Sequence, residues 1–384
     1  MVTSVIVASS GGDYTTLSAA EGAENTDLTG LGDFTFNCEG FEDTTDVGFS
    51  GWTTTASDRI IVKAAVGHEH DGVPYAQSGG GYKINTTTLT PIRFGEDFVT
   101  LQDIETNSSS GGAISFAGIT SASDIIVNRC ILTDTRASAS TSYVVFGSVA
   151  NLNLTLANCL ILGKARAIDT RNATSVAIDN CTMFTDAAAL GLIADTELTC
   201  KNTYVGGYST EDFWTGGAAP AGNNNASADT TATTDYTTSL ISKATADQFT
   251  NPTVDTATCD FSLKSGNALE DAGATLTYAD DITNTTRAGT WDIGAYETVA
   301  GPSSGINTRY RRFSMMNFGK GTLLVDPATS GVDQGERQTF LNAYSGISFS
   351  NPAPATDTEL LTTLQSMGRG FGQARAARLG GELQ

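Results

Sequence analysis

The sequence predicts an all-β fold in which the chain winds into stacked parallel coils, and three observations support this. Gly, Thr, Ser and Asn are abundant, with 41 glycines among 384 residues, as expected when every coil needs turns. Apolar residues alternate two apart in short runs, which is typical of strands with one face inward. These runs return every 22 to 29 residues. That interval is the size of one coil of a right-handed parallel β-helix, a solenoid.

Five segments align without gaps and define successive coils, with steps of 26, 29, 22 and 22 residues. The alignment places Cys130, Cys159 and Cys181 in one inward column, between Ile104 and Thr203. The chain has no C-x-x-C pair and no disulfide framework, so we interpret these cysteines as small core residues rather than metal ligands or nucleophiles. The segments are Val99–Thr106, Ile125–Leu132, Leu154–Ile161, Val176–Met183 and Leu198–Val205; the remaining cysteines are Cys38, Cys200 and Cys259.

An asparagine column lies directly before the cysteine column and contains Asn158, Asn180 and Asn202. Asparagine tolerates the left-handed backbone conformation that a tight bend requires. Stacked asparagine amides can also hydrogen-bond to one another along such a column. The sequence therefore predicts a bend at this position in each coil.

The open ends of a solenoid expose unpaired backbone groups and must be covered. Near the start, Gly12–Glu21 contains the spacing of a capping box from Ser18 to Glu21. We therefore expect a short helix that covers the first coil.

The net charge of −21 is unevenly distributed along the chain. Up to Ser304 there are 13 basic and 36 acidic residues, a balance of −23, and from Gly305 onward 8 basic and 6 acidic residues, a balance of +2. This asymmetry fits two parts, a β-helix over residues 1–300 and a second module over residues 301–384, or else one domain with a neutral tail. So acidic a protein is a poor partner for nucleic acid or for an anionic membrane surface.

The first ten residues lack the basic start and apolar stretch of a secretory signal, and no later run approaches the roughly 20 apolar residues of a membrane span. We therefore expect a protein that is neither exported nor inserted in a membrane. The module at residues 301–384 is predicted to be small and helical or irregular. One helix covers Asp333–Tyr344, and a second follows the capping spacing from Thr356 to Glu359.

Stretches at both ends of the predicted β-helix carry recognisable motifs, with Gly12–Glu21 at the opening end and Trp291–Glu297 at the closing end. These stretches resemble a family of right-handed β-helix proteins found in bacteria and in tailed bacteriophages. At the closing end, Asp260–Gly273 and Trp291–Glu297 are similar to the family's last coil, which usually ends on the Asp-Ile-Gly-Ala-Tyr-Glu motif found here at Asp292–Glu297. The resemblance implies a virion spike or decoration protein. The opening end resembles the family at Gly12–Glu21, Ser50–Thr54, Val62–Gly72 and Gly81–Ile84.

The second module resembles a short module of phage structural proteins. The resemblance rests on the basic stretch Arg309–Gly319, the pair Glu336-Arg337 and the stretch Tyr344–Ile347. It implies docking on the particle; a lid folded over the last coil is the alternative.

His68 and His70, followed by Asp71, are the candidate metal ligands because they lie two apart. The flanking Gly67 and Gly72 favour a turn instead. No Gly-x-Ser-x-Gly elbow accompanies the histidines, and the glycines at 79–81 and 216–217 lack the Lys-Ser or Lys-Thr of a phosphate-binding loop. We therefore assign no metal and no cofactor.

Carboxylates are the candidates for glycan cleavage. Four residues past the cysteine column the alignment gives Asp134, Gly163 and Thr185, so the second acid, Asp186, is one position out of register. Two strand spacings separate the acids by about 10 Å, beyond the roughly 6.5 to 9.5 Å of an inverting pair. Acids beside aromatic residues, as at a sugar subsite, also occur in the predicted loop Glu211–Trp214. We assign no catalytic residue, and a non-enzymatic protein is favoured over an enzyme.

The resemblance thus implies a bacteriophage virion structural protein, assembled in the host cytoplasm, whose β-helix projects from the capsid or tail. Its expected partners are other virion proteins, contacted through residues 301–384, and further copies of itself, with a trimer favoured. Host surface glycans are a further candidate partner. The alternatives are a glycan depolymerase tailspike and a bacterial surface adhesin.

Overall fold

The chain divides into two units, Met1–Val299 and Ala300–Gln384, in the computed structural model. The helices expected between residues 301 and 384 lie outside the residues that the structure describes. The described residues are 3–74, 81–87, 90–136, 143–147, 149–164, 166–169, 171–185, 190–194, 198–215, 221–232, 238–254 and 258–298.

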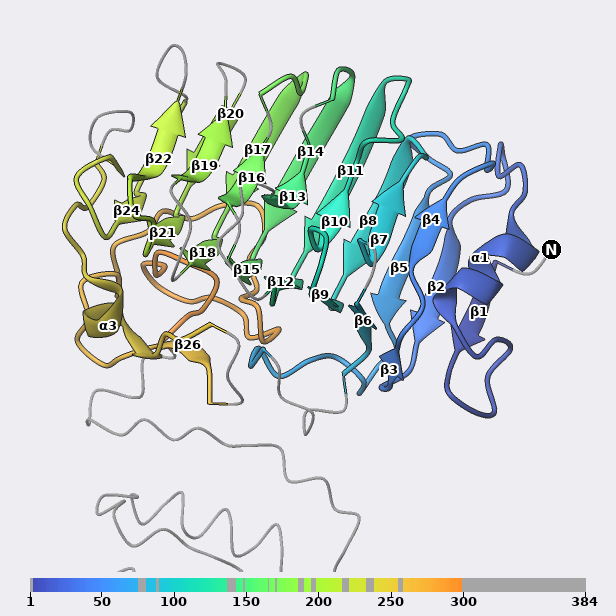
Figure 1. The fold of residues 1–384 in the computed structure, drawn as a ribbon, viewed down its shortest axis with the longest axis horizontal. Helices are drawn as coiled ribbons and strands as arrows, with labels where there is room; N and C mark the ends of the chain where they lie inside the picture. The colour runs from blue at the N-terminus through green and yellow to red at the C-terminus, as the bar shows by residue number, and fades with distance from the viewer. Residues whose placement is uncertain are drawn as a thin grey trace, which may run out of the picture. The chain divides into compact units, whose positions relative to one another are not determined.

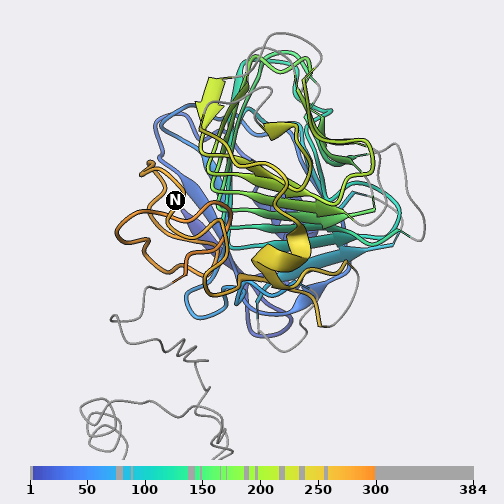
Figure 2. The same ribbon diagram turned by 90° about the vertical axis from the view of Figure 1, so that its left-hand side faces the viewer.

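Three parallel sheets form the first unit, because each complete coil contributes one strand to each sheet (Figures 1 and 2). This arrangement confirms the predicted right-handed parallel β-helix. The nine-stranded sheet contains β1 (Ser4–Val7), β2 (Phe34–Cys38), β5 (Ile60–Ala64), β8 (Phe98–Gln102), β11 (Ser123–Asn128), β14 (Leu152–Ala157), β17 (Ser175–Asp179), β20 (Leu198–Lys201) and β23 (Ala221–Asn223). The eight-stranded sheet contains β3 (Glu42–Asp43), β6 (Lys83–Thr86), β9 (Glu105–Ser108), β12 (Ile131–Asp134), β15 (Leu160–Gly163), β18 (Thr182–Thr185), β21 (Tyr204–Gly206) and β24 (Ala226–Ser227). The seven-stranded sheet contains β4 (Val47–Phe49), β7 (Ile92–Phe94), β10 (Ile114–Ser115), β13 (Tyr143–Phe146), β16 (Arg166–Asp169), β19 (Leu190–Ala194) and β22 (Glu211–Thr215).

The register of the nine-stranded sheet agrees with the alignment made from the sequence. Val99 pairs with Ile125, which pairs with Leu154, and the same column continues through Val176 to Leu198. A shift by one residue would turn the apolar set of a strand to solvent, so the inward column holds each coil in place.

The cysteine column lies inside the coils, as predicted. Cys130, Cys159 and Cys181 are fully buried and carry free thiols. The Cys159 Sγ atom lies 3.1 Å from the Ala157 carbonyl oxygen and 3.5 Å from that of Val127. Burial raises the pKa values of Cys130 and Cys181 well above their usual range, so both stay protonated in the core.

The asparagine column adopts the predicted left-handed conformation, with φ near +50° at Asn158, Asn180 and Asn202. The Asn202 amide donates to the Asn180 side-chain oxygen at 2.9 Å, so the amide ladder forms at this step. In earlier coils an ion pair occupies the same column. Arg129 donates to both oxygens of Asp103 at 2.6 and 2.8 Å.

The N-terminal end is covered by α1 (Leu17–Glu24), which confirms the predicted helix. The predicted capping box is wrong, because Thr16 rather than Ser18 caps the helix and its hydroxyl accepts from the Ala19 amide at 3.1 Å. Glu21 turns away from the helix start and accepts from the Ser50 amide and the Trp52 indole. Within the described residues no helix is long and apolar enough to cross a membrane.

Residues 258–298, which we call the strap, pack on the outside of the coils. The prediction that Asp260–Gly273 and Trp291–Glu297 form a last coil is therefore wrong. The strap begins with β26 (Asp260–Leu263), antiparallel to β25 (Phe249–Asn251), which follows the short helix α3 (Thr245–Gln248).

A second apolar cluster holds the strap on the outer face of the eight-stranded sheet. Strap residues such as Phe261 and Ile293 join outward residues such as Leu162, whereas Leu132 and Ile161 belong to the inner core. The strap also crosses to the asparagine column, where Asn202 donates to the Ala274 carbonyl at 2.6 Å. Near its end, the Tyr296 hydroxyl donates to the carbonyl of Gly72, so the strap runs back toward the early coils.

Candidate functional site

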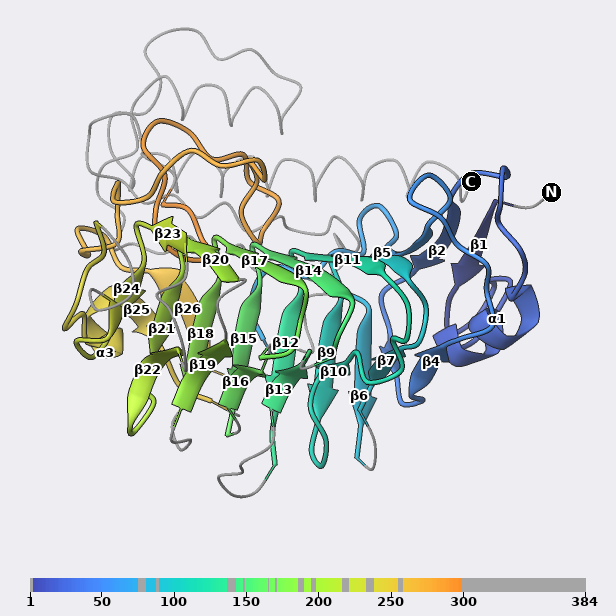
Figure 3. The ribbon, with the colours of Figure 1, turned by 90° about the horizontal axis from the view of Figure 1, so that it is seen from above.

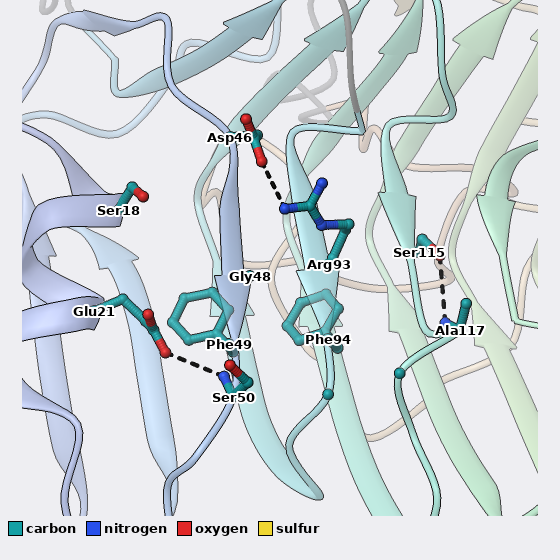
Figure 4. A pocket seen from close by; sticks show the side chains of 12 residues that line it. Ser18, Glu21, Asp46, Gly48, Phe49, Ser50, Arg93, Phe94, Ser115 and Ala117 are labelled. Carbon is teal, nitrogen blue, oxygen red and sulfur yellow. Dashed lines mark hydrogen bonds and ion pairs between the residues drawn. The ribbon is translucent and has the colours of Figure 1, made fainter.

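A groove lies on the outer face of the seven-stranded sheet, beside α1 (Figure 4). Val47 and Phe49 of β4 point into the core, so the residue between them, Gly48, faces out. In the same outward column lie Arg93 of β7 and Ser115 of β10. The groove has a volume of about 560 Å³. Its lining residues are Ser18, Glu21, Asp46, Gly48, Phe49, Ser50, Arg93, Phe94, Gly95, Ser115, Ala117 and Gly118.

Small residues make the floor of the groove. A Cβ atom on Gly118 would lie 2.9 Å from the Cα atom of Gly95, so a larger residue at this position would push the two coils apart. A Cβ atom on Gly48 would instead lie 3.6 Å from the Arg93 guanidinium, an ordinary contact. The floor of the groove is therefore closely packed backbone without large side chains, so no side chain of the floor fills the groove.

Charged and hydroxyl side chains form the walls. The guanidinium of Arg93 lies 2.7 Å from the carboxylate of Asp46, and both side chains are partly exposed. The other wall carries Glu21, whose carboxylate accepts from the Ser50 amide at 3.1 Å. No histidine or cysteine occurs among the residues that line the groove. Its chemistry is that of hydrogen bonding to a polar ligand on a rigid sheet.

The helix beside the groove is anchored by a buried carboxylate. Asp43 accepts from the Leu17 amide at 2.9 Å and from the Tyr82 hydroxyl at 3.0 Å. This contact joins the first turn of α1 to β3 and to the loop before β6. The groove wall is therefore held by the core of the first coils rather than by surface contacts.

The histidines contact backbone groups and lie in the loop after β5 rather than on a strand. His68 accepts from the Gly40 amide at 3.0 Å. His70 is buried; its Nε2 donates to the Arg129 carbonyl at 2.7 Å and its Nδ1 accepts from the Gly72 amide at 3.3 Å. Across the described part of the chain, no group of three His, Cys, Asp or Glu residues is placed to hold a metal ion.

Asp134, a sequence candidate for glycan cleavage, points into the coil and not to the outer surface. Leu132 faces the core, and strand alternation turns Asp134 to the same side. Its carboxylate is fully buried and lies 2.6 Å from the Arg136 guanidinium. Burial raises the pKa of Asp134, and Arg136 partly offsets the increase. The predicted register with Gly163 and Thr185 is correct, and Asp186 lies outside the described residues.

Asp212 lies in β22, not in the predicted loop, and its partner Asp229 was not identified from the sequence. Each carboxylate accepts from the backbone amide of the other residue, at 2.9 and 3.0 Å. Asp212 is buried, and burial together with Asp229 raises its pKa to about 7. A perturbed acid of this kind is a candidate proton donor. The side chain of Trp214 is not among those described.

The contribution of Asp212 to the stability of the protein is expected to fall as pH rises from about 4 to about 7. The folded state keeps a proton on Asp212 that the unfolded chain releases near pH 4, so its contribution is present below that value and is lost through pH 7. Asp212→Asn should flatten this part of the profile in urea unfolding. Asp46→Asn, at the exposed pair with Arg93, is the control and should leave the slope unchanged. An unchanged slope in Asp212→Asn would contradict the assignment.

Comparison with protein-family models found no match, and comparison with curated proteins found none. Among solved structures, the chain is similar to a pectin methylesterase from Aspergillus niger, crystallised in a penultimately deglycosylated form. The two share 12% sequence identity over 63% of this chain and 85% of that chain, with a TM-score of 0.38. The fold itself rests on the sheet topology of this chain, a right-handed parallel β-helix with a polar groove on one outer face.

Proposed function

We propose that the chain is a structural protein of a tailed bacteriophage virion that displays its β-helix outward and binds host surface glycans through the seven-stranded sheet. The groove beside α1 carries this proposal. Helix α1 and three successive coils supply its polar side chains, so a chain of sugar units crossing the strands would meet donors and acceptors at each coil spacing. The strap packs on the outer face of the eight-stranded sheet and reaches the asparagine column, away from the seven-stranded sheet (Figure 3).

The charge distribution supports the outward display. The balance of −23 up to Ser304 keeps a protein soluble and discourages nonspecific association, whereas residues 305–384 carry a balance of +2. We infer that residues 301–384 dock on capsid or tail proteins and that the β-helix assembles as a homo-oligomer, a trimer in the favoured case. The phage resemblance of the sequence motifs supports the same location.

Mass spectrometry of purified virions tests the location, and the protein should be present in them. Deleting residues 301–384 should abolish association with the particle while the far-ultraviolet circular dichroism of the β-helix stays unchanged. A clean absence from virions would overturn the proposal. Aggregation of the truncated protein would show that the segment is a cap rather than a docking module.

Filling the groove tests glycan binding. Gly48→Leu adds a side chain where a Cβ atom meets only an ordinary contact, so the variant is expected to fold and to weaken glycan binding at least tenfold. Thr35→Leu, on the outer face of the nine-stranded sheet, is the matched control and should bind as the unmodified protein does. Equal binding by both variants, measured by calorimetry, would remove the groove from the site.

The second candidate function is a glycan depolymerase, and the Asp212–Asp229 pair is the observation that favours it. The burial of Asp212 opposes this function, because a glycosidic oxygen must reach the acid that protonates it. Incubation with host capsular or lipopolysaccharide glycans should therefore yield no new reducing ends and no unsaturated products. If cleavage products form with the unmodified protein and are absent with Asp212→Ala, the protein is a glycan depolymerase instead.

A further inference from the structure

A cluster of aromatic and arginine side chains continues the groove toward the later coils. Ser115, which lines the groove, pairs in register with Phe146 of β13. Phe146 in turn pairs with Asp169 of β16. We call Tyr143, Phe146 and Arg166 the tyrosine–arginine patch. Its strands β13 and β16 follow β10 directly in the seven-stranded sheet (Figures 1 and 3).

The patch combines two partly exposed rings with one guanidinium. The ring centroids of Tyr143 and Phe146 lie 6.0 Å apart, and both side chains are partly exposed. The Arg166 guanidinium carbon lies 5.6 Å from the centroid of the Tyr143 ring, and its Nη1 donates to the Tyr143 hydroxyl at 3.1 Å. These contacts fix the guanidinium above the ring, so its orientation is set before a ligand arrives.

The neighbouring charges leave one positive charge at the patch. Arg171 donates from two nitrogens to the two oxygens of Asp169, at 3.0 and 2.9 Å, and this pair is neutral as a unit. Arg166 is partly exposed, and its one protein hydrogen bond in the described structure goes to the neutral Tyr143 hydroxyl.

A carboxylate fits this arrangement best. The guanidinium fork matches the two oxygens of a planar carboxylate, and a charge-assisted pair of this type is stronger than a neutral hydrogen bond. The apolar face of a sugar ring packs against aromatic rings such as those of Tyr143 and Phe146. The acidic solenoid repels polyanions in general, so an acidic glycan needs a local cation to bind.

We propose that the tyrosine–arginine patch binds a carboxylated sugar unit of the glycan, with the carboxylate on Arg166 and the sugar ring against Tyr143. This inference rests on the proposed glycan-binding function and names its ligand class, an acidic saccharide such as a uronic acid polymer. The groove beside α1 then holds adjoining units of the same chain along the sheet.

The full chain should be applied to an array of neutral, sulfated and carboxylated oligosaccharides, including carboxylated ones whose acid groups have been reduced to alcohols. Binding is expected for carboxylated members and should be lost on their reduced counterparts. Arg166→Gln should weaken binding about tenfold or more, as expected for one charge-assisted pair. Tyr143→Phe keeps the ring, removes the hydroxyl that orients Arg166, and should give a smaller loss.

Lys63→Gln removes one positive charge from the outer face of the nine-stranded sheet and should leave binding unchanged. An equal loss of binding affinity in Lys63→Gln and Arg166→Gln would contradict the assignment of the patch as the carboxylate site. Equal binding of reduced and carboxylated oligosaccharides would contradict it as well. Neither result would contradict glycan binding in the groove. Binding only to sulfated members would also overturn the assignment of the patch. If no member binds, glycan binding as a whole fails, whereas virion mass spectrometry separately decides the display role. The comparison of reduced with carboxylated oligosaccharides uses the unmodified protein. It therefore tests the proposal even if one of the variants does not fold.

Discussion

Replacing Arg287 with methionine is expected to destabilise the protein by about 3–5 kcal/mol, because the change leaves a buried carboxylate without its partner. The Arg287 side chain is fully buried and lies 3.0 Å from the Glu297 carboxylate. It also donates to the Gly294 carbonyl at 2.8 Å and lies over the ring of Trp291. These contacts close the end of the strap.

The loss should depend on pH, because burial raises the pKa of Glu297 to about 7. Below that value Glu297 is protonated and tolerates the absence of Arg287, so the destabilisation should be smaller at pH 5 than at pH 8. Urea unfolding followed by tryptophan fluorescence measures both values. Arg93→Met breaks an exposed pair and should cost less than about 1 kcal/mol. A comparable cost in the two variants would contradict the structural role assigned to Arg287.

The second large effect is expected at Phe94, whose replacement by alanine should cost about 3–5 kcal/mol. Its ring stacks between Phe49 and Phe116, with centroid separations of 5.9 and 5.1 Å, and all three side chains are fully buried. Alanine would leave a cavity that joins three coils. Because each coil contacts only its neighbours, the damage should centre on β4, β7 and β10.

Thermal unfolding and hydrogen exchange measure this effect. Exchange should accelerate first in the strands around residue 94, and Phe94→Leu should lose clearly less stability because it fills most of the space. Uniform acceleration across all coils, or equal losses in the two variants, would show that the ring stack is not a local support. The same experiment bears on the groove, since Phe49 and Phe94 also line it.

The inward columns were predictable from the sequence because adjacent coils carry similar residues at equivalent positions. The pairing of Val99, Ile125 and Leu154 follows directly from alignment of the segments. The left-handed asparagines follow from a residue preference that acts within a single bend. The helix near the start was also found, but its cap was assigned two residues too late, since serine is by type the better cap and only the fold shows that Thr16 takes this role.

The strap was not predictable because its apolar residues alternate as those of a coil strand do. Phe261 and Leu263 have the spacing of an inward pair, yet they pack on the outside of the eight-stranded sheet. The candidate acids were misplaced for a related reason. Asp134 and Asp212 were considered as surface acids because of the residues next to them in the sequence. Their burial depends instead on which face of the strand each side chain occupies and on partners such as Asp229.

By itself the sequence determined the coil length, the register of the nine-stranded sheet and the core character of the cysteines. Each follows from short-range alternation and from repetition between adjacent coils. Only the tertiary structure decided which outer faces the strap covers and that the groove and the tyrosine–arginine patch share one sheet. Those features join positions far apart in the chain, as when Tyr296 contacts Gly72, and no local pattern records such contacts. The eight-stranded sheet carries apolar side chains on its outer face as well as on its inner face. The strap returns across that outer face because this contact removes the apolar side chains from water.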